Sequence, residues 1–241
     1  MRTLVSVVVL VTVSLVVAAV GRLMWRQRTS ARDTAVALVT TAALAAWAAV
    51  AALLAYQGAF TGSSGEAVPP VGIALGSALA GTLAALAGSQ SLRRLLGSQA
   101  DLTRLHAWRL LGAVFVLMML WSRLPALFAL PAGLGDIAIG ATATWMARHA
   151  DRPGGRRLIA WHGLGLADLV LAVALGITTS PGPSQIFHTV PTSEAMTMFP
   201  LAVVPVFLVP LALTLHCLSL ARLAAGHRTV KPLARSSVVN A

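Results

Sequence analysis

Two aspartates lie within stretches of the sequence that otherwise contain almost only apolar residues. Asp136 and Asp168 each follow a short segment that begins with Gly-Leu and ends in a small residue. A charged side chain at the centre of a bilayer costs at least about 2.5 kcal/mol, so each carboxyl group there requires a chemical reason. Two carboxyl groups that meet can share a proton, and together with a histidine they can bind a divalent cation. The alternative is that both are protonated and only form hydrogen bonds between helices.

His216 is the third candidate, because it lies deep in the last apolar stretch of the chain. Three prolines precede it, and one of them, Pro205, shares its helical face, which predicts a kinked helix with freed carbonyl groups. Such broken helices often line cavities. We predict Asp136, Asp168 and His216 as the catalytic or binding residues. The cofactor is unknown at this point, since these groups suit a proton or a divalent cation, and pairs of histidines could also hold a haem.

The remaining polar residues near these stretches are expected at the membrane boundaries. His106 and His162 have the positions of ordinary interfacial histidines. Arg109 and Arg123 lie toward the two ends of a short apolar stretch, and both are expected to extend their guanidinium groups to the interface. The sequence contains no motif for phosphate, dinucleotide or zinc binding.

Composition assigns the chain to the membrane proteins. Of its 241 residues, 57% are hydrophobic and only 10% are charged. A soluble domain of this size would need many more charges to cover its apolar residues, so lipid must be the covering. The net charge of +11 could suggest nucleic acid. However, the basic residues lie in short loops between apolar stretches instead of on a water-facing surface, which argues against a nucleic-acid partner.

Seven apolar stretches are long enough to cross a hydrocarbon core, which takes roughly 17 to 25 residues in a helix. They cover residues 3–20, 35–56, 68–89, 105–121, 124–146, 158–177 and 197–221. The sequence therefore predicts an all-α fold, a polytopic bundle of seven transmembrane helices. The fourth and fifth helices must be joined by a very tight hairpin. Residues 1–224 are predicted to form a single domain, and residues 225–241 a basic, disordered cytoplasmic tail.

Basic residues predict the orientation, because short arginine-rich loops are retained in the cytoplasm. The inner segments carry Arg22, Arg26, Arg28, Arg32, Arg93, Arg94, Arg104, Arg109, Arg148, Arg152, Arg156, Arg157, Arg222, Arg228, Lys231 and Arg235. Only Arg2 and Arg123 fall on the outer side. The tryptophans expected at the inner interface are Trp25, Trp108, Trp145 and Trp161. The N-terminus is therefore expected outside and the C-terminus in the cytoplasm.

Two segments allow a second interpretation. Residues 3–20 resemble a secretory signal, but cleavage would leave the arginines that follow on the outer side, so we expect a true helix. The outer loops 57–70 and 178–196 are rich in Gly, Pro, Ser and Thr. The second loop could cover an outer mouth of the bundle, but we expect a flexible connection there.

Part of the sequence resembles a group of uncharacterised bacterial membrane proteins. The similar segments are RLPA at 123–126, LPAGLGD at 130–136, LGLAD at 164–168 and the proline-rich stretch that ends at His216. The resemblance covers mainly the C-terminal half and implies a seven-helix membrane protein. It carries no known activity, so it transfers no functional residue. Microbial rhodopsins share the helix number, but the last apolar stretch here has no lysine that could hold retinal.

Three functions remain open from the sequence. The leading hypothesis is a transport-like or proton-linked protein of the cell membrane, whose polar pocket centres on Asp136, Asp168 and His216. The second is an integral-membrane enzyme that acts on a lipid or isoprenoid, with a protonated aspartate as general acid. The third is a non-catalytic subunit or assembly factor. Besides the lipid bilayer, the expected partners are a small hydrophobic molecule, a proton or a cation, with a partner subunit under the third hypothesis.

Overall fold

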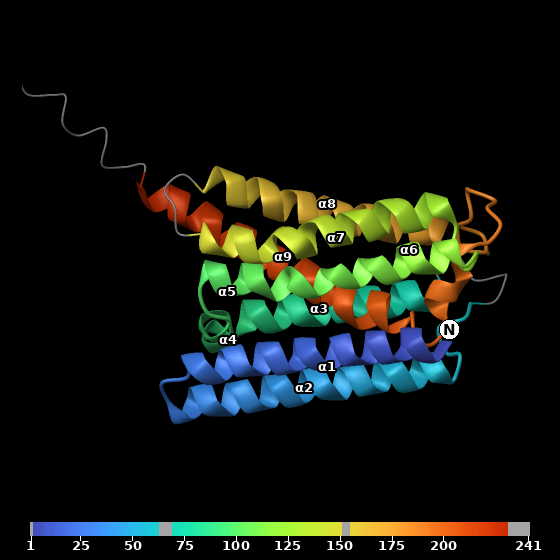
Figure 1. Cartoon of the computed structure of the whole chain (residues 1–241). Coiled ribbons are helices and arrows are strands. Elements are labelled where there is room, and N and C mark those ends of the chain that lie inside the picture. The colour runs from blue at the N-terminus through green and yellow to red at the C-terminus, as the bar shows by residue number, and fades with distance from the viewer. Residues whose placement is uncertain (1, 63–68, 151–154, 231–241) are drawn as a thin grey trace, which may run out of the picture.

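The computed structural model describes residues 2–62, 69–150 and 155–230, with side chains through residue 225 (Figure 1). Over these ranges the chain is all-α and contains no strand. Seven helices in the described part are long and apolar enough to cross a membrane, as the sequence predicted. The tail predicted at residues 225–241 lies mostly outside the described residues, and its first part continues the last helix as far as Val230.

These seven membrane-length segments, called crossings below, are mostly single continuous helices, and two are built from several pieces. The continuous ones are α1 (Arg2–Gln27), α2 (Ala31–Tyr56), α3 (Pro70–Gly88), α7 (Ala126–Arg148) and α8 (Arg156–Thr178). The short helix α4 (Gln90–Leu95) precedes the fourth crossing, which consists of α5 (Gln99–Arg104), the 3₁₀ helix η1 (Leu105–Gly112) and α6 (Ala113–Leu120). The last crossing follows the 3₁₀ turn η2 (Ser193–Thr197) and consists of the π-helical η3 (Val204–Leu208) and α9 (Val209–Val230).

Polar caps and turn residues set where the helices begin. Ser30 accepts a hydrogen bond from the backbone N–H of Asp33 at the start of α2, and Ser98 closes a capping box at the start of α5. Between α6 and α7 the chain turns through Ser122, which has a φ of 55°, and Pro125 precedes the first residue of α7. This confirms the tight hairpin that was predicted between the fourth and fifth crossings.

The last crossing lies in the middle of the bundle. Figure 1 shows the α1–α2 hairpin along one edge and α7 with α8 along the opposite edge, with α9 passing between them. Within the most apolar window of the last crossing 78% of the residues are buried, against 6% in α3. The outer helices therefore present the apolar outer surface, and α9 supplies the interior against which the polar residues pack.

The 3₁₀ geometry of η1 aligns a column of side chains. In a 3₁₀ helix residues three apart lie directly above one another, whereas in an α-helix they drift around the axis. Thr103, His106, Arg109 and Gly112 follow this spacing, and all four are buried. A 3₁₀ helix of eight residues is unusually long, and such segments often mark a strained or functional part of a helix. As a result, η1 directs a polar row into the bundle.

Helix η1 packs so closely on α7 that glycine is required at the contacts. A Cβ atom on Gly133 would lie 2.9 Å from the carbonyl oxygen of Gly112, and one on Gly140 would lie 2.5 Å from the backbone nitrogen of Leu110. Small residues permit such an approach between helices. Gly133 and Gly140 therefore face η1, because the hairpin folds the fourth crossing directly back along α7.

The arginine-rich segments gather at one end of the bundle. The helices alternate in direction, so the ends of α1, α3 and α7 meet the starts of α2, α5 and α8 there (Figure 1). Asp33 at the start of α2 is buried and pairs with Arg94 of α4, which attaches the α1–α2 hairpin to the rest of the bundle. Trp25 and Trp145 are exposed, as an interfacial belt requires. By contrast, Trp161 is buried inside the bundle and does not belong to the predicted belt.

Candidate functional site

Arg109 is the centre of the candidate site. Its side chain is fully buried, its Nε donates to Oδ1 of Asp136 over 2.6 Å, and its Nη2 donates to Oδ2 of Asp168. Two carboxyl groups therefore bind different nitrogens of one guanidinium group. Arg109 was predicted to extend to the membrane interface, and this prediction was wrong. The 3₁₀ column turns the side chain inward, where two aspartates compensate its charge.

Two glycines make room for this arrangement. A Cβ atom on Gly135 of α7 would overlap the carboxyl group of Asp168, and one on Gly165 of α8 would lie 2.5 Å from Cε1 of His216. Asp168 and His216 can reach Arg109 only because the facing helices have no side chain at these two positions. The small residues that precede both aspartates in the sequence thus have a steric role in the site.

His216 approaches the same guanidinium group from α9. Its Nε2 lies 3.2 Å from Nη1 of Arg109, which also donates to the carbonyl oxygen of Gly165 over 3.1 Å. The structure therefore brings together all three residues predicted from the sequence, and it does so through Arg109. With both carboxyl groups ionised, Arg109, Asp136 and Asp168 together carry a net negative charge.

Arg109 also determines where the hydrogens lie on two histidines. An arginine nitrogen can only donate, so Nε2 of His216 must accept and its Nδ1 carries the hydrogen. Nδ1 of His216 lies 2.9 Å from Nδ1 of His162, which then accepts. The hydrogen of neutral His162 is consequently on its Nε2. In this row of hydrogen bonds, each group donates to the next one away from Arg109.

His162 extends the chain of polar groups to α5. Its Nε2 lies 3.4 Å from Oγ1 of Thr103 and 3.4 Å from the side-chain amide of Gln99. Oε1 of Gln99 is buried without a partner in the described part of the chain, so turning the amide over lets this oxygen accept the hydrogen of His162. His162 and His106 are fully buried, which corrects the interfacial positions predicted for both. The reason is that α8 and η1 turn these rings toward α9.

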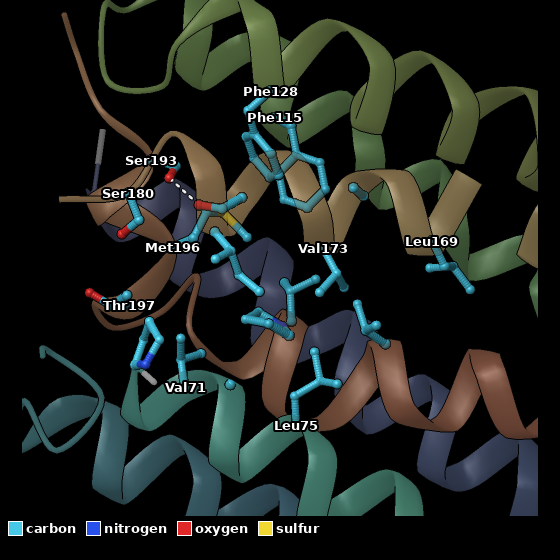
Figure 2. Close-up of a pocket in the computed structure, with 18 of the residues that line it drawn as sticks. Val71, Leu75, Phe115, Phe128, Leu169, Val173, Ser180, Ser193, Met196 and Thr197 are labelled. Atoms are coloured by element: carbon cyan, nitrogen blue, oxygen red, sulfur yellow. Dashed lines mark hydrogen bonds between the residues drawn. The ribbon is translucent and has the colours of Figure 1, made fainter. Parts of the chain in front are cut away.

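An apolar cavity of about 80 Å³ reaches Asp136 from the opposite end of the bundle (Figure 2). Phe115 and Phe128 lie on one side of it, with 5.7 Å between their ring centroids, and Val71 and Leu75 of α3 lie across from them. Among the described lining residues, Asp136 alone is charged. The cavity therefore ends at a single carboxyl group that is already bound to Arg109.

The loop between α8 and the last crossing covers the outer part of this cavity. Ser193 is buried and donates to the carbonyl oxygen of Gly176 over 2.6 Å, which holds η2 against α8 (Figure 2). Ser180, Met196 and Thr197 line the cavity beside it. From the sequence, a flexible connection was expected here. Its last part, η2, instead packs over the cavity through its buried serine and methionine, whereas none of residues 180–192 is buried.

The cavity and the polar chain together extend through most of the bundle. The cavity runs from the loop cover to Asp136, and the chain continues from Arg109 through His216 and His162 to Gln99. Arg109 lies between the two parts. Because an arginine does not release its proton in proteins, a proton can pass from Asp136 to His216 only if Arg109 leaves its place.

All residues of the candidate site lie within one region that matches a known protein family. The family model "Domain of unknown function (DUF8737)" matches residues 68–224, which is more than half of the chain. The chain belongs to this family. No curated protein and no solved structure matches the chain. The DUF8737 match runs from the start of α3 into α9, so it contains Arg109, both aspartates and all three buried histidines, while α1 and α2 lie outside it.

Sequence reasoning missed Arg109, His106 and His162 as site residues of the DUF8737 domain. The predicted fourth crossing began at residue 105, whereas the helix begins at Gln99, so Arg109 lies deeper by about two turns. The three-residue spacing from Thr103 through His106 and Arg109 was the available signal. In an α-helix this spacing turns by about 60° per step, so it places neighbouring pairs on one face. It aligns the whole row only in a 3₁₀ helix.

Proposed function

We propose that this DUF8737 protein carries a small cation with an apolar body across the membrane in exchange for protons. Asp136 and Asp168 bind either the proton or the cation, and the guanidinium group of Arg109 changes position when they do. The observation that supports this is the buried guanidinium group between two carboxyl groups at the base of an apolar cavity. Each charge inside a membrane bundle costs at least about 2.5 kcal/mol, and helix packing alone does not require three of them.

The charge balance favours a cationic cargo. Arg109 with two ionised aspartates carries a net negative charge, which a low-dielectric interior disfavours. One proton on either carboxyl group, or one cation in the cavity beside Asp136, makes the cluster neutral. A proton and a cationic solute therefore compete for the same charge, and such competition is the basis of exchange.

The lining of the cavity sets the second property of the cargo. Trp108, Phe115 and Phe128 line it together with Asp136, and most of the other lining side chains are aliphatic. Aromatic rings attract ammonium groups by about 0.5 to 2 kcal/mol. A small alkylammonium ion satisfies both the charge of Asp136 and the apolar walls.

Arg109 links the cavity to the chain of histidines. A proton or a cation on one aspartate removes a partner of the guanidinium group and so favours a second position for it. From there the polar chain of His216 and His162 leads to the arginine-rich end of the bundle. We place this end in the cytoplasm, because short arginine-rich segments are retained there.

The experiment uses the full chain in liposomes that contain a pH-sensitive dye. Tetramethylammonium and tetraethylammonium are the probes, since quaternary ions cannot carry protons through lipid by themselves. An inward gradient of either ion should make the lumen alkaline. Asp136→Asn and Asp168→Asn should abolish this signal while the protein elutes as a folded species in size-exclusion chromatography. Glu194→Gln, which changes an exposed carboxyl group, is the matched control and should leave the signal intact.

Full proton exchange by both aspartate variants would refute the proposal. A wild-type protein that moves no protons against either ion, but changes the mass of a lipid in a lipid extract, would favour the membrane enzyme instead. Stable co-purification with another chain, again without exchange, would favour the non-catalytic subunit.

A further inference from the structure

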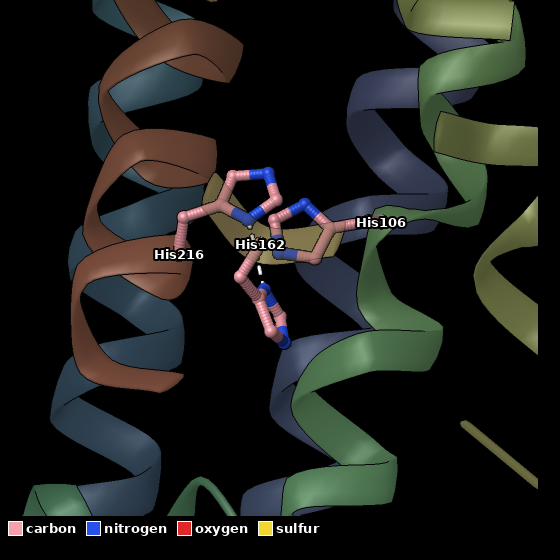
Figure 3. Close-up of side chains that lie close together, drawn as sticks. All are labelled: His106, His162 and His216. Atoms are coloured by element: carbon pink, nitrogen blue, oxygen red, sulfur yellow. Dashed lines mark hydrogen bonds between the residues drawn. The ribbon is translucent and has the colours of Figure 1, made fainter. Parts of the chain in front are cut away.

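Three histidines from three different crossings meet beside the candidate site. His106 of η1, His162 of α8 and His216 of α9 are fully buried, and each offers a ring nitrogen within 4.8 Å of the others (Figure 3). Figure 3 shows the contact between the Nδ1 atoms of His162 and His216, which are 2.9 Å apart. The proposed exchange gives no role to His106.

Hydrogen bonding does not account for a histidine at position 106. Neither Nδ1 nor Nε2 of His106 has a partner in the described part of the chain. Leaving such buried polar groups unpaired costs roughly 1 to 3 kcal/mol. The ring stacks on His216 with 3.8 Å between centroids and meets the ring of Trp161 edge-on at 5.7 Å. A phenylalanine could make both contacts without that cost, so a ligand on one of the two nitrogens would account for a histidine at this position.

We infer that His106, His162 and His216 bind one divalent transition-metal ion. Three imidazoles that leave a fourth position for another ligand are a set that Zn²⁺ uses, with distances of about 2.0 to 2.1 Å to each nitrogen. The ligand nitrogens already lie within 4.8 Å of one another. Rotation of the rings about their Cβ–Cγ bonds brings them to one ion, and it opens the stacked pair of His106 and His216.

The groups around His162 orient it as a metal ligand. A metal-bound histidine binds through one nitrogen and donates the hydrogen of the other to a fixed acceptor. With Nδ1 of His162 on the ion, its Nε2 hydrogen faces Oγ1 of Thr103 and the amide of Gln99, both at 3.4 Å. The unpartnered Oε1 of Gln99 is a suitable acceptor for it.

His216 couples the metal ion to the charged cluster. When its Nδ1 binds the ion, the hydrogen moves to Nε2, which can then no longer accept from Nη1 of Arg109 at 3.2 Å. Nη1 of Arg109 can then donate only to the carbonyl oxygen of Gly165, which it already contacts. The net negative charge of Arg109 with its two aspartates favours a cation at this distance. Metal binding therefore loosens the contact between Arg109 and His216. It also replaces the hydrogen bond between His216 and His162, so the polar chain of the proposed exchange is complete only in the metal-free protein.

The test measures metal binding by the full chain, purified in detergent through an affinity tag that contains no histidine. After incubation with zinc and removal of the excess, elemental analysis should find about one ion per chain, as a site of three imidazoles holds. Cobalt(II) in place of zinc should give the visible absorption bands of a tetrahedral site. No cargo is present, so failure of this experiment and failure of the proton-exchange experiment are independent results.

The most informative variant is His106→Phe, which keeps the ring contacts and removes both nitrogens. Zinc content should fall at least about tenfold, in line with the loss of a ligand, while the melting temperature in the absence of metal stays the same or rises. His162→Ala and His216→Ala should lose zinc as well. The matched controls are His149→Phe and His188→Phe, which change histidines on the surface and should keep the zinc ion.

Retention of a zinc ion by His106→Phe would overturn the inference. A folded wild-type protein that binds neither zinc nor cobalt would overturn it as well. A lower melting temperature of metal-free His106→Phe would show that the His106 nitrogens stabilise the fold without metal, and this result would also count against a ligand role.

Discussion

The Nε of Arg109 donates to Oδ1 of Asp136 over 2.6 Å, although the two residues are 27 positions apart in the sequence. Two features of the fold produce this contact. The 3₁₀ helix η1 aligns Arg109 with the other buried residues of its column, and the glycines between η1 and α7 let the two backbones approach. Because the same guanidinium group also binds Asp168 and His216, elements from four crossings meet at one side chain.

Replacement of Arg109 by methionine should destabilise the protein strongly. Both aspartates would lose their cation, and breaking a buried ion pair in this way costs roughly 3 to 5 kcal/mol. The melting temperature in detergent, followed by tryptophan fluorescence, should therefore fall. Adding Asp136→Asn and Asp168→Asn to Arg109→Met should restore part of the stability, because no uncompensated charge remains. Arg123→Met changes an exposed arginine and serves as the control. An unchanged melting temperature for Arg109→Met would show that the cluster contributes nothing to folding.

Replacement of two glycines of α8 by alanine should affect the stability of the protein differently. A Cβ atom on Gly165 would lie 2.5 Å from Cε1 of His216, whereas one on Gly163 would meet nothing within 4 Å. Gly165→Ala should therefore destabilise by about 1 to 3 kcal/mol, the range for overpacking a closed interior. Gly163→Ala should be neutral or stabilise by up to about 1 kcal/mol through helix propensity. Thermal unfolding of the two variants side by side provides the measurement. Equal effects would mean that the contact between Gly165 and His216 is not close in solution.

Loss of the Ser193 hydroxyl should open the cavity. In Ser193→Ala the carbonyl oxygen of Gly176 loses its donor, so η2 is held less firmly against α8. A cysteine at Thr197, in a background with Cys217→Ala, should then react several-fold faster with a maleimide. Thr12→Ala removes a hydroxyl from α1, away from the cavity, and should leave the rate unchanged. The same rate in Ser193→Ala would contradict the role of the loop as a cover.

The predicted orientation can be tested with single cysteines in the Cys217→Ala background. Thr61→Cys lies at the end of the bundle that is poor in arginine, and Gln27→Cys lies at the arginine-rich end. A maleimide that does not cross membranes should label Thr61→Cys in intact cells. It should label Gln27→Cys only after the membrane is permeabilised, because arginine-rich segments stay in the cytoplasm. Reversed labelling would overturn the orientation.

The long apolar helices and three of the polar residues inside them could be predicted from the linear sequence. Hydrocarbon thickness requires long apolar runs, and such runs are visible in a linear sequence, so all seven long apolar helices of the described part could be located. Their ends were less well predicted, since α1 continues to Gln27 and the fourth crossing already begins at Gln99. Asp136, Asp168 and His216 were predicted for a similar reason, since each is a polar residue that interrupts an apolar run. Both inferences depend only on the position of a residue along the chain.

Which polar residues meet was decided by the tertiary structure alone. Arg109 and His106 lie toward the arginine-rich end of the predicted fourth crossing, and in an α-helix the row from Thr103 to Gly112 would drift around the axis. The row stays on one buried face because η1 is a 3₁₀ helix, and the choice between hydrogen bonds three and four residues apart is only weakly encoded by local residue types. The close contacts of η1 with α7, and the position of α9 in the centre, place Arg109 between the two aspartates and His106 beside His216. These are packing interactions between distant segments, and no linear pattern records them.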